Sequence, residues 1–211
     1  MFLLKSISTQ SSKNTLRIGV SVSGLITIFT GEGKGKTSAA LGMLLRATCA
    51  GMKVAWIAWY KDPSWAVSEY RIPELLPGVA FFPMGKGFSF GKEKTGPTEV
   101  RRTKTGAVVD TASHNEHVNA AVEALHRAKE IITSKQYDLV ILDECVQAAG
   151  DGLLDEQELL SVLSSRGETH VILTGRHCPQ SLQDIADTVT SMEKVKHAYD
   201  QGILAVKGLD F

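Results

Sequence analysis

A glycine-rich segment with one lysine and one threonine is the part of this sequence best suited to hold phosphate. It reads Gly31-Glu32-Gly33-Lys34-Gly35-Lys36-Thr37-Ser38. Glycines let consecutive backbone N–H groups converge on phosphate oxygens, and a helix that begins here adds the positive end of its dipole. Lys36 is placed to neutralise phosphate charge, and the Thr37 hydroxyl is placed to bind Mg²⁺. The segment predicts a site for a nucleoside triphosphate with Mg²⁺.

The spacing of this phosphate loop is one residue shorter than usual. A standard loop has about four residues between its first glycine and Gly-Lys-Thr, whereas three residues separate Gly31 from Gly35. The loop follows an apolar run at residues 25–29 and opens a helix-like run at 36–49, as a strand, phosphate loop and helix should. The segment therefore indicates a triphosphate firmly but ordinary hydrolysis only weakly.

Two further polar groups follow apolar strand-like runs. Asp143 and Glu144 follow residues 139–142, and Arg176 follows residues 170–173. The carboxyl ends of parallel strands meet at one edge of a sheet, where ligands bind. One of the two acids can hold Mg²⁺ there, directly or through water, and the arginine fork suits phosphate. We expect these residues to lie beside the phosphate loop.

Strand-like and helix-like runs alternate along the chain. Strands are predicted near 25–29, 54–59, 79–82, 139–142, 170–173 and 188–195, and helices near 36–49, 112–133, 155–165 and 179–186. This alternation indicates an α/β fold with a mostly parallel sheet and helices on both faces.

Composition and length limit the remaining possibilities. We expect a flexible arm at residues 1–20 and a single domain at 21–211. The 23 basic residues balance the 23 acidic ones, which argues against a nucleic-acid partner. No apolar run is long enough to span a membrane, and the three cysteines lack metal-like spacing. A cytoplasmic location is the expectation. Residues 85–107, which are rich in glycine and lysine, interrupt the alternation and predict a long active-site loop.

The chain resembles the P-loop (bacterial) type of ATP:corrinoid adenosyltransferase. The similarity includes the shortened loop within residues 28–40, the run Val140-Ile141-Leu142-Asp143-Glu144, and segments of the last third. Those later segments are Val171-Ile172-Leu173-Thr174-Gly175-Arg176-His177-Cys178, residues 184–190 and Val195-Lys196-His197-Ala198-Tyr199-Asp200-Gln201-Gly202. The similarity covers residues 24–90 and 108–211.

The resemblance implies a RecA-like P-loop fold and an adenosyl transfer reaction. Cob(I)alamin attacks the 5′ carbon of ATP and expels triphosphate, so that donors around the phosphates stabilise the leaving group. It further implies ATP and a corrinoid as co-substrates, Mg²⁺ as cofactor, a homodimer, and a reduced flavoprotein as electron donor.

The resemblance also assigns roles to individual residues. Arg46 matches a family arginine near ATP. Phe88 and Phe90 match aromatic residues that pack beneath the corrin ring, where loss of the lower axial ligand makes Co(II) easier to reduce. Phe90 replaces the tryptophan common in relatives, and Glu32 replaces an asparagine. A carboxylate in a phosphate loop is unfavourable unless it faces Mg²⁺, a base or solvent.

The expected site has three overlapping sets of residues. The catalytic set is Lys36, Phe88, Phe90 and Arg176; the nucleotide-binding set is Gly31, Glu32, Gly33, Lys34, Gly35, Lys36, Thr37, Ser38 and Arg46; and the metal set is Thr37, Asp143 and Glu144. Two alternatives stay open at this point. Another P-loop NTPase or kinase would release ADP, whereas a non-catalytic module would bind nucleic acid or carry a corrinoid.

Overall fold

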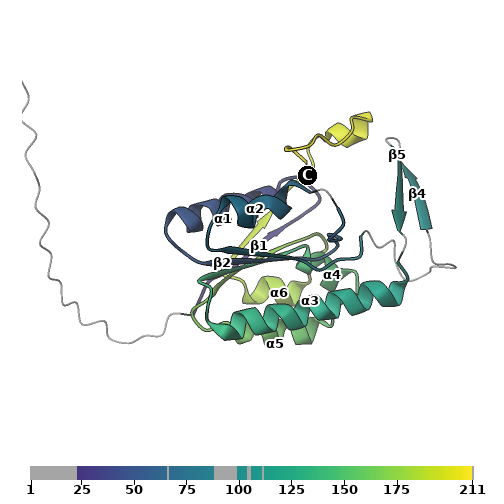
Figure 1. The fold of residues 1–211 in the computed structure, drawn as a ribbon. Coiled ribbons are helices and arrows are strands. Elements are labelled where there is room, and N and C mark those ends of the chain that lie inside the picture. The colour runs from purple at the N-terminus through teal and green to yellow at the C-terminus, as the bar shows by residue number, and fades with distance from the viewer. Residues whose placement is uncertain (1–22, 66, 88–98, 104–105, 111, 211) are drawn as a thin grey trace, which may run out of the picture.

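The structure is a computed structural model that describes residues 23–65, 67–87, 99–103, 106–110 and 112–210, with only the backbone described from 99 to 110. The predicted arm at 1–20 and both Phe88 and Phe90 lie outside these ranges. A six-stranded sheet in the order β3-β2-β6-β7-β1-β8 forms the centre of the protein, with helices on both faces (Figure 1).

The strands of this sheet are β1 (Ile26–Thr30), β2 (Val54–Ala58), β3 (Val79–Pro83), β6 (Leu139–Asp143), β7 (His170–Thr174) and β8 (Thr188–Ser191). The helices are α1 (Lys36–Cys49), α2 (Ile72–Leu75), α3 (His114–Ser134), α4 (Cys145–Gly150), α5 (Glu156–Ser164) and α6 (Gln180–Ile185), with 3₁₀ turns η1 (Ser68–Arg71) and η2 (Ala198–Gln201). Every neighbouring pair of strands is parallel, so all six carboxyl ends lie at one edge. The predicted α/β class is confirmed.

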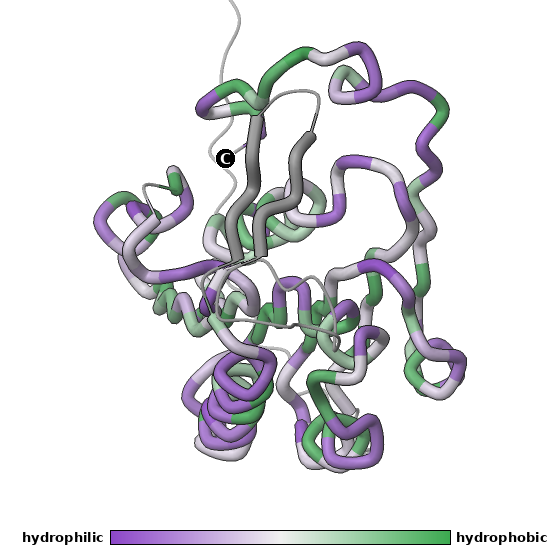
Figure 2. The backbone as a smooth tube through the Cα atoms, turned by 90° about the vertical axis from the view of Figure 1, so that its right-hand side faces the viewer, coloured by the Kyte–Doolittle hydropathy of each residue, from purple (hydrophilic) through white to green (hydrophobic). Residues whose placement is uncertain are grey.

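Alternate residues of the central strands point into two separate cores. On one face, α1 packs Ala40 and Leu44 over Trp56 and Ile141. On the other face, helices α3 to α6 cover the alternate residues of the same strands. These include Ile57, Val140, Leu142 and Leu173. Strands buried on both sides must be apolar throughout, which is why β2 and β6 lack alternation. The hydropathy-coloured trace shows helices that alternate hydrophobic and hydrophilic residues, as helices with one buried side do (Figure 2).

Capping residues define both ends of helix α3. Ser113 and Glu116 form a reciprocal capping box at its start, and Lys135 adopts a left-handed conformation with φ 54° at its end. Its 21 residues agree closely with the prediction at 112–133. Neither α3 nor any other helix in the described ranges is long and apolar enough to cross a membrane.

Within the described residues, the structure corrects the last part of the predicted loop at 85–107. Strands β4 (Glu99–Thr103) and β5 (Gly106–Asp110) pair as an antiparallel hairpin that stands apart from the main sheet (Figure 1). The prediction was wrong there because glycine and lysine content outweighed the Val-rich run at 107–109 in our interpretation. Strand β8 also ends at Ser191, earlier than predicted, and the backbone of Met192 bonds to Thr30 and to Gly33 of the phosphate loop.

Candidate nucleotide site

The phosphate loop connects the end of β1 to the first turn of α1. Gly31 and Gly35 have φ values of 93° and 122°, which residues with a Cβ rarely adopt. Gly35 caps α1, and its carbonyl accepts the first helical hydrogen bond from Ala39 N at 2.7 Å. The loop therefore needs glycine at both ends to reverse direction between strand and helix.

The loop is supported from the far end of the sequence. Met192 N donates to Thr30 O at 2.8 Å, and Gly33 N donates to Met192 O at 2.7 Å. A Cβ on Gly31 would lie 2.5 Å from Met192 O, and one on Gly33 would lie 2.6 Å from Glu193 O. Both contacts are shorter than side chains tolerate. These glycines therefore allow a close backbone approach in addition to any contact with phosphate.

The Lys36 side chain curls back over the loop. It is buried, with 6% of its surface exposed, and its Nζ donates to Gly31 O at 2.7 Å and to Gly33 O at 2.9 Å. Burial lowers the pKa of this ammonium, while the nearby carboxylates of Glu144 and Glu32 act in the opposite direction. A cation is thus held at the centre of the loop, where a triphosphate would need one.

Asp143 joins the loop to the ends of β6 and β7. Its Oδ1 accepts hydrogen bonds from Thr37 Oγ1 at 3.0 Å and from Thr174 Oγ1 at 2.6 Å. Its Oδ2 accepts no regular hydrogen bond from the described residues but lies 3.1 Å from Lys61 Nζ. The carboxylate is fully buried, so this ion pair and the two hydroxyl donors together offset its loss of water.

Lys61 is a site residue that the sequence interpretation missed. Its ammonium lies between Asp143 and Glu69, 3.1 Å and 3.2 Å from their carboxylate oxygens. Burial alone would lower the pKa of Lys61, but the two carboxylates outweigh burial and raise it. The available signal was its position: a basic residue soon after the doubly buried strand β2 must lie at the ligand-binding edge.

Glu144 is held in an unusual conformation beside Asp143. Its φ is 62°, and its amide donates to Thr174 Oγ1 at 2.9 Å. Oε2 is buried and has no hydrogen-bond partner among the described residues. Burial, and then the charge of Asp143, raise the pKa of Glu144 to about 7. An orphaned carboxylate oxygen near the Thr37–Asp143 pair suits a hard cation such as Mg²⁺.

Across the loop mouth, Glu32 faces bases rather than water alone. Its carboxylate oxygens lie 3.6 Å from Arg176 Nε and 3.7 Å from His177 Nε2. His177 Nδ1 in turn lies 3.1 Å from Asp151 Oδ1, and Tyr60 OH donates to Asp151 Oδ2 at 2.9 Å. Nearby bases and solvent exposure together account for the carboxylate at position 32, and Arg176 lies at the loop as predicted.

Comparison with known proteins identifies the family. The model of the ATP:corrinoid adenosyltransferase family BtuR/CobO/CobP matches residues 22–211. The chain belongs to this family. It is 34% identical over 189 residues to corrinoid adenosyltransferase CobA of Salmonella typhimurium, spanning 89% of this chain and 86% of that protein. The corrinoid adenosyltransferases of Escherichia coli K12 and Pseudomonas aeruginosa are 33% and 31% identical over 89% of the chain.

Membership agrees with the strand order. The phosphate-loop strand β1 is separated from the acidic strand β6 by β7, as in RecA-like P-loop folds. Within the described part of the chain, no group of three His, Cys, Asp or Glu residues gathers as a metal cluster. A site of one or two carboxylates and a threonine is what Mg²⁺ uses when substrate phosphates supply further ligands.

The remaining predicted residues lie at different distances from the phosphate loop. Lys34 is half-exposed on the loop and pairs with Asp210 of the C-terminal segment, and Ser38 is exposed in the first turn of α1. Arg46 is exposed in the last turn of α1, about 15 Å along the helix from Lys36. The structure therefore does not bring Arg46 to the loop of its own chain. Phe88 and Phe90 lie outside the described residues.

Proposed function

We propose that this protein transfers the 5′-deoxyadenosyl group of ATP to the Co(I) of a reduced corrinoid and releases triphosphate. A cobalt–carbon bond forms at the 5′ carbon, and the carbon–oxygen bond of ATP breaks with its electron pair going to triphosphate. The observation that carries the proposal is a one-residue-short loop with a buried lysine, in a chain that belongs to the corrinoid adenosyltransferase family.

The loop residues supply what this leaving group requires. Negative charge grows on triphosphate as the carbon–oxygen bond breaks, so backbone N–H groups and the Lys36 ammonium stabilise the transition state electrostatically. Arg176, at the mouth of the loop, adds a second cation. Nothing in this reaction needs a protein nucleophile, so the protein acts by positioning two substrates.

Two residues would bind Mg²⁺ in this proposal, and a third, Asp143, would orient them. Thr37 offers a hydroxyl, Glu144 offers its unpartnered oxygen, and Asp143 fixes Thr37 through a 3.0 Å hydrogen bond. When bound, the ion would neutralise phosphate charge. Asp143 already accepts from two hydroxyls and faces Lys61, so its role is to orient ligands from outside the first coordination sphere.

An anaerobic assay tests the proposal. The protein is mixed with MgATP and chemically reduced cobalamin, and the corrin absorbance is followed with the phosphate products. We expect a light-sensitive alkylcobalamin and one triphosphate for each adenosyl group transferred. Steady release of ADP without an alkylated corrin would instead establish an NTPase or kinase.

The roles of Phe88 and Phe90 at the lower face of the corrin form a further part of the proposal. Phe88→Ala should abolish activity that starts from Co(II) and a weak reductant, but should leave most activity when Co(I) is supplied. Equal losses in both assays would contradict this role. A reduced flavoprotein as electron donor, a homodimeric assembly and a cytoplasmic location complete the proposal, on the basis of the resemblance.

A further inference from the structure

Two consecutive residues after β2 each reach a different buried or half-buried carboxylate. Tyr60 has φ 60°, and its hydroxyl donates to Asp151, while Lys61 pairs with Asp143. Lys61 N also donates to Trp59 O at 2.7 Å, which closes a tight turn. We call these two residues the Tyr60–Lys61 turn. A left-handed tyrosine is costly, so the surrounding contacts must hold it in place.

The turn contacts both ends of the phosphate loop through one or two intermediates. Lys61 reaches Asp143, whose other oxygen accepts from Thr37 at 3.0 Å. Tyr60 reaches Asp151, which lies 3.1 Å from His177, and His177 lies 3.7 Å from Glu32. Any displacement of the turn would therefore move residues that contact Glu32 and Thr37 of the loop.

On its other side, the turn fixes the segment that follows β3. Gly85 N donates to Lys61 O at 2.9 Å, and Gly87 N donates to Tyr60 O at 3.0 Å. A Cβ on Gly85 would lie 2.2 Å from Tyr60 C and 2.4 Å from Lys61 N, both backbone atoms. Residues 84–87 thus follow the turn closely, with no room for a side chain between them.

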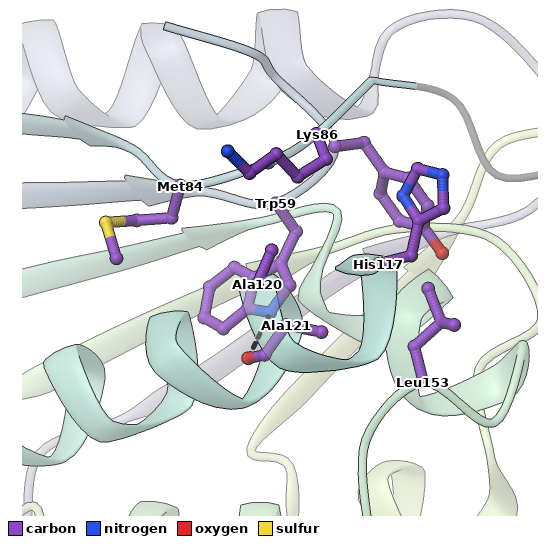
Figure 3. Close-up of a pocket in the computed structure, with 9 residues that line it drawn as sticks. Trp59, Met84, Lys86, His117, Ala120, Ala121 and Leu153 are labelled. Carbon is purple, nitrogen blue, oxygen red and sulfur yellow. Dashed lines mark hydrogen bonds between the residues drawn. The ribbon is translucent and has the colours of Figure 1, made fainter. Parts of the chain in front are cut away.

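A small hollow lies beneath this contact. Trp59, Met84 and Lys86 line it from the sheet side, and His117 and Ala120 line it from α3 (Figure 3). Trp59 Nε1 donates to Ala121 O at 3.2 Å and anchors the end of β2 to α3. The residue that precedes the turn is therefore anchored to α3, while the turn itself contacts residues 84–87 and the carboxylates beside the phosphate loop.

We propose that the Tyr60–Lys61 turn is a positioning element that couples nucleotide binding at the phosphate loop to the placement of residues 84–87. Coupling between two sites is reciprocal, so a change at residues 84–87 must alter nucleotide affinity. The inference rests on the proposed function in one respect: residues 84–87 directly precede Phe88, the residue expected beneath the corrin. The turn itself touches neither substrate in this scheme.

The test measures MgATP affinity by isothermal titration calorimetry with no corrinoid present. Gly85→Ala should raise the Kd about tenfold, because its Cβ displaces the turn from Asp143 and Asp151. The matched control is Gly42→Ala, since a Cβ at Gly42 meets nothing within 4 Å; its Kd should stay within about twofold. A folded Gly85→Ala protein with unchanged Kd would overturn the inference.

A second variant keeps the test decisive if Gly85→Ala fails to fold. Tyr60→Phe removes only the hydroxyl bonded to Asp151 and should raise the Kd about threefold. Where Gly85→Ala does fold, the double variant should bind no more weakly than Gly85→Ala alone, because both changes act through one turn. An unchanged Kd in Tyr60→Phe, or fully additive effects, would contradict the coupling. A wild-type protein that binds MgATP but transfers no adenosyl group would overturn only the proposed function.

Discussion

At the carboxyl edge of the sheet, the half formed by β1, β6 and β7 differs from the half formed by β2 and β3 in how its side chains are positioned. In the first half, consecutive residues of one motif supply glycines, Lys36 and Thr37, and one acidic pair faces them. In the second half, Lys61 and Gly85 come from separate loops and meet through backbone contacts. Motif residues and positioning residues thus occupy neighbouring halves of one edge.

The difference indicates that the first half should bind the reacting groups and the second half should hold the site in its shape. A lysine held by two carbonyls 2.7 and 2.9 Å away can exchange these partners for phosphate oxygens. A lysine held between two carboxylates cannot leave without depriving the buried Asp143 and the partly buried Glu69 of their shared cation. We therefore expect activity to be most sensitive in the first half, and stability in the second.

The largest expected effect is on catalysis by the loop lysine. Lys36→Ala should lower kcat/KM for adenosyl transfer about a hundredfold or more, because a preorganised cation is lost from the leaving triphosphate. Lys53→Ala, an exposed lysine at the opposite edge of the sheet, is the control and should retain full activity. If kcat/KM of Lys36→Ala stayed within tenfold of wild type, the first half would not be the half that stabilises the leaving group.

Loss of the other lysine should appear first in stability. Lys61→Met leaves the carboxylates of Asp143 and Glu69 without their shared cation, and we expect the free energy of unfolding to fall by about 3 kcal/mol. Urea denaturation measures this, and Lys61→Arg should recover much of the loss because it restores the charge. If Lys61→Met were as stable as wild type, the contrast between the two lysines would disappear.

Glu144 should make the nucleotide-free protein depend on pH. Its pKa in the folded protein is about 7, above the ordinary value of 4.5, so the folded state binds more protons than the unfolded state between these values. Stability should therefore fall as pH rises from about 4.5 to about 7, by about 3 kcal/mol at most.

Denaturation with EDTA across this pH range checks the sign of the Glu144 effect. Glu144→Gln should remove most of the fall, whereas Glu123→Gln, an exposed acid on α3, should follow wild type. A Glu144→Gln protein that loses stability with pH as wild type does would show that another group titrates.

The smallest effect is expected at the exposed pair between the loop and the C-terminal segment. Asp210→Asn removes the charge facing Lys34, and solvent screens such pairs strongly. The melting temperature should change by less than about 2 °C, and adenosyl transfer by less than about twofold. A tenfold loss of activity would mean that the C-terminal segment belongs to the nucleotide site.

The sequence predicted the first half of the edge well and the second half poorly. The loop, α1 and the acids at the end of β6 are local sequence patterns whose spacing predicts the chemistry, and α1 lies at Lys36–Cys49 as predicted. Lys61 was missed because its contact with Asp143 depends on β2 lying beside β6, and no local pattern shows the order of strands. Gly85 and Tyr60 meet through backbone atoms, and such contacts leave no side-chain signal in a single sequence.

Other differences between prediction and structure have separate causes. The hairpin β4–β5 was predicted as part of a loop, because paired short strands are recognised only together. Arg46 was assigned by resemblance, but its place in the last turn of α1 separates it from the loop. Helix α4 was not predicted, because its six residues give no helical period.

The two hydrogen bonds that Met192 makes to Thr30 and Gly33 have a consequence for how the protein is made. The loop leaves the ribosome well before residues 192 and 193, whose backbone groups lie against it. At roughly 5–20 residues per second, a ribosome needs on the order of ten seconds or more to reach them. The nascent chain carries its nucleotide motif throughout this interval without the scaffold that shapes it. Competence to bind ATP should therefore arise only after residues 192 and 193 have been made.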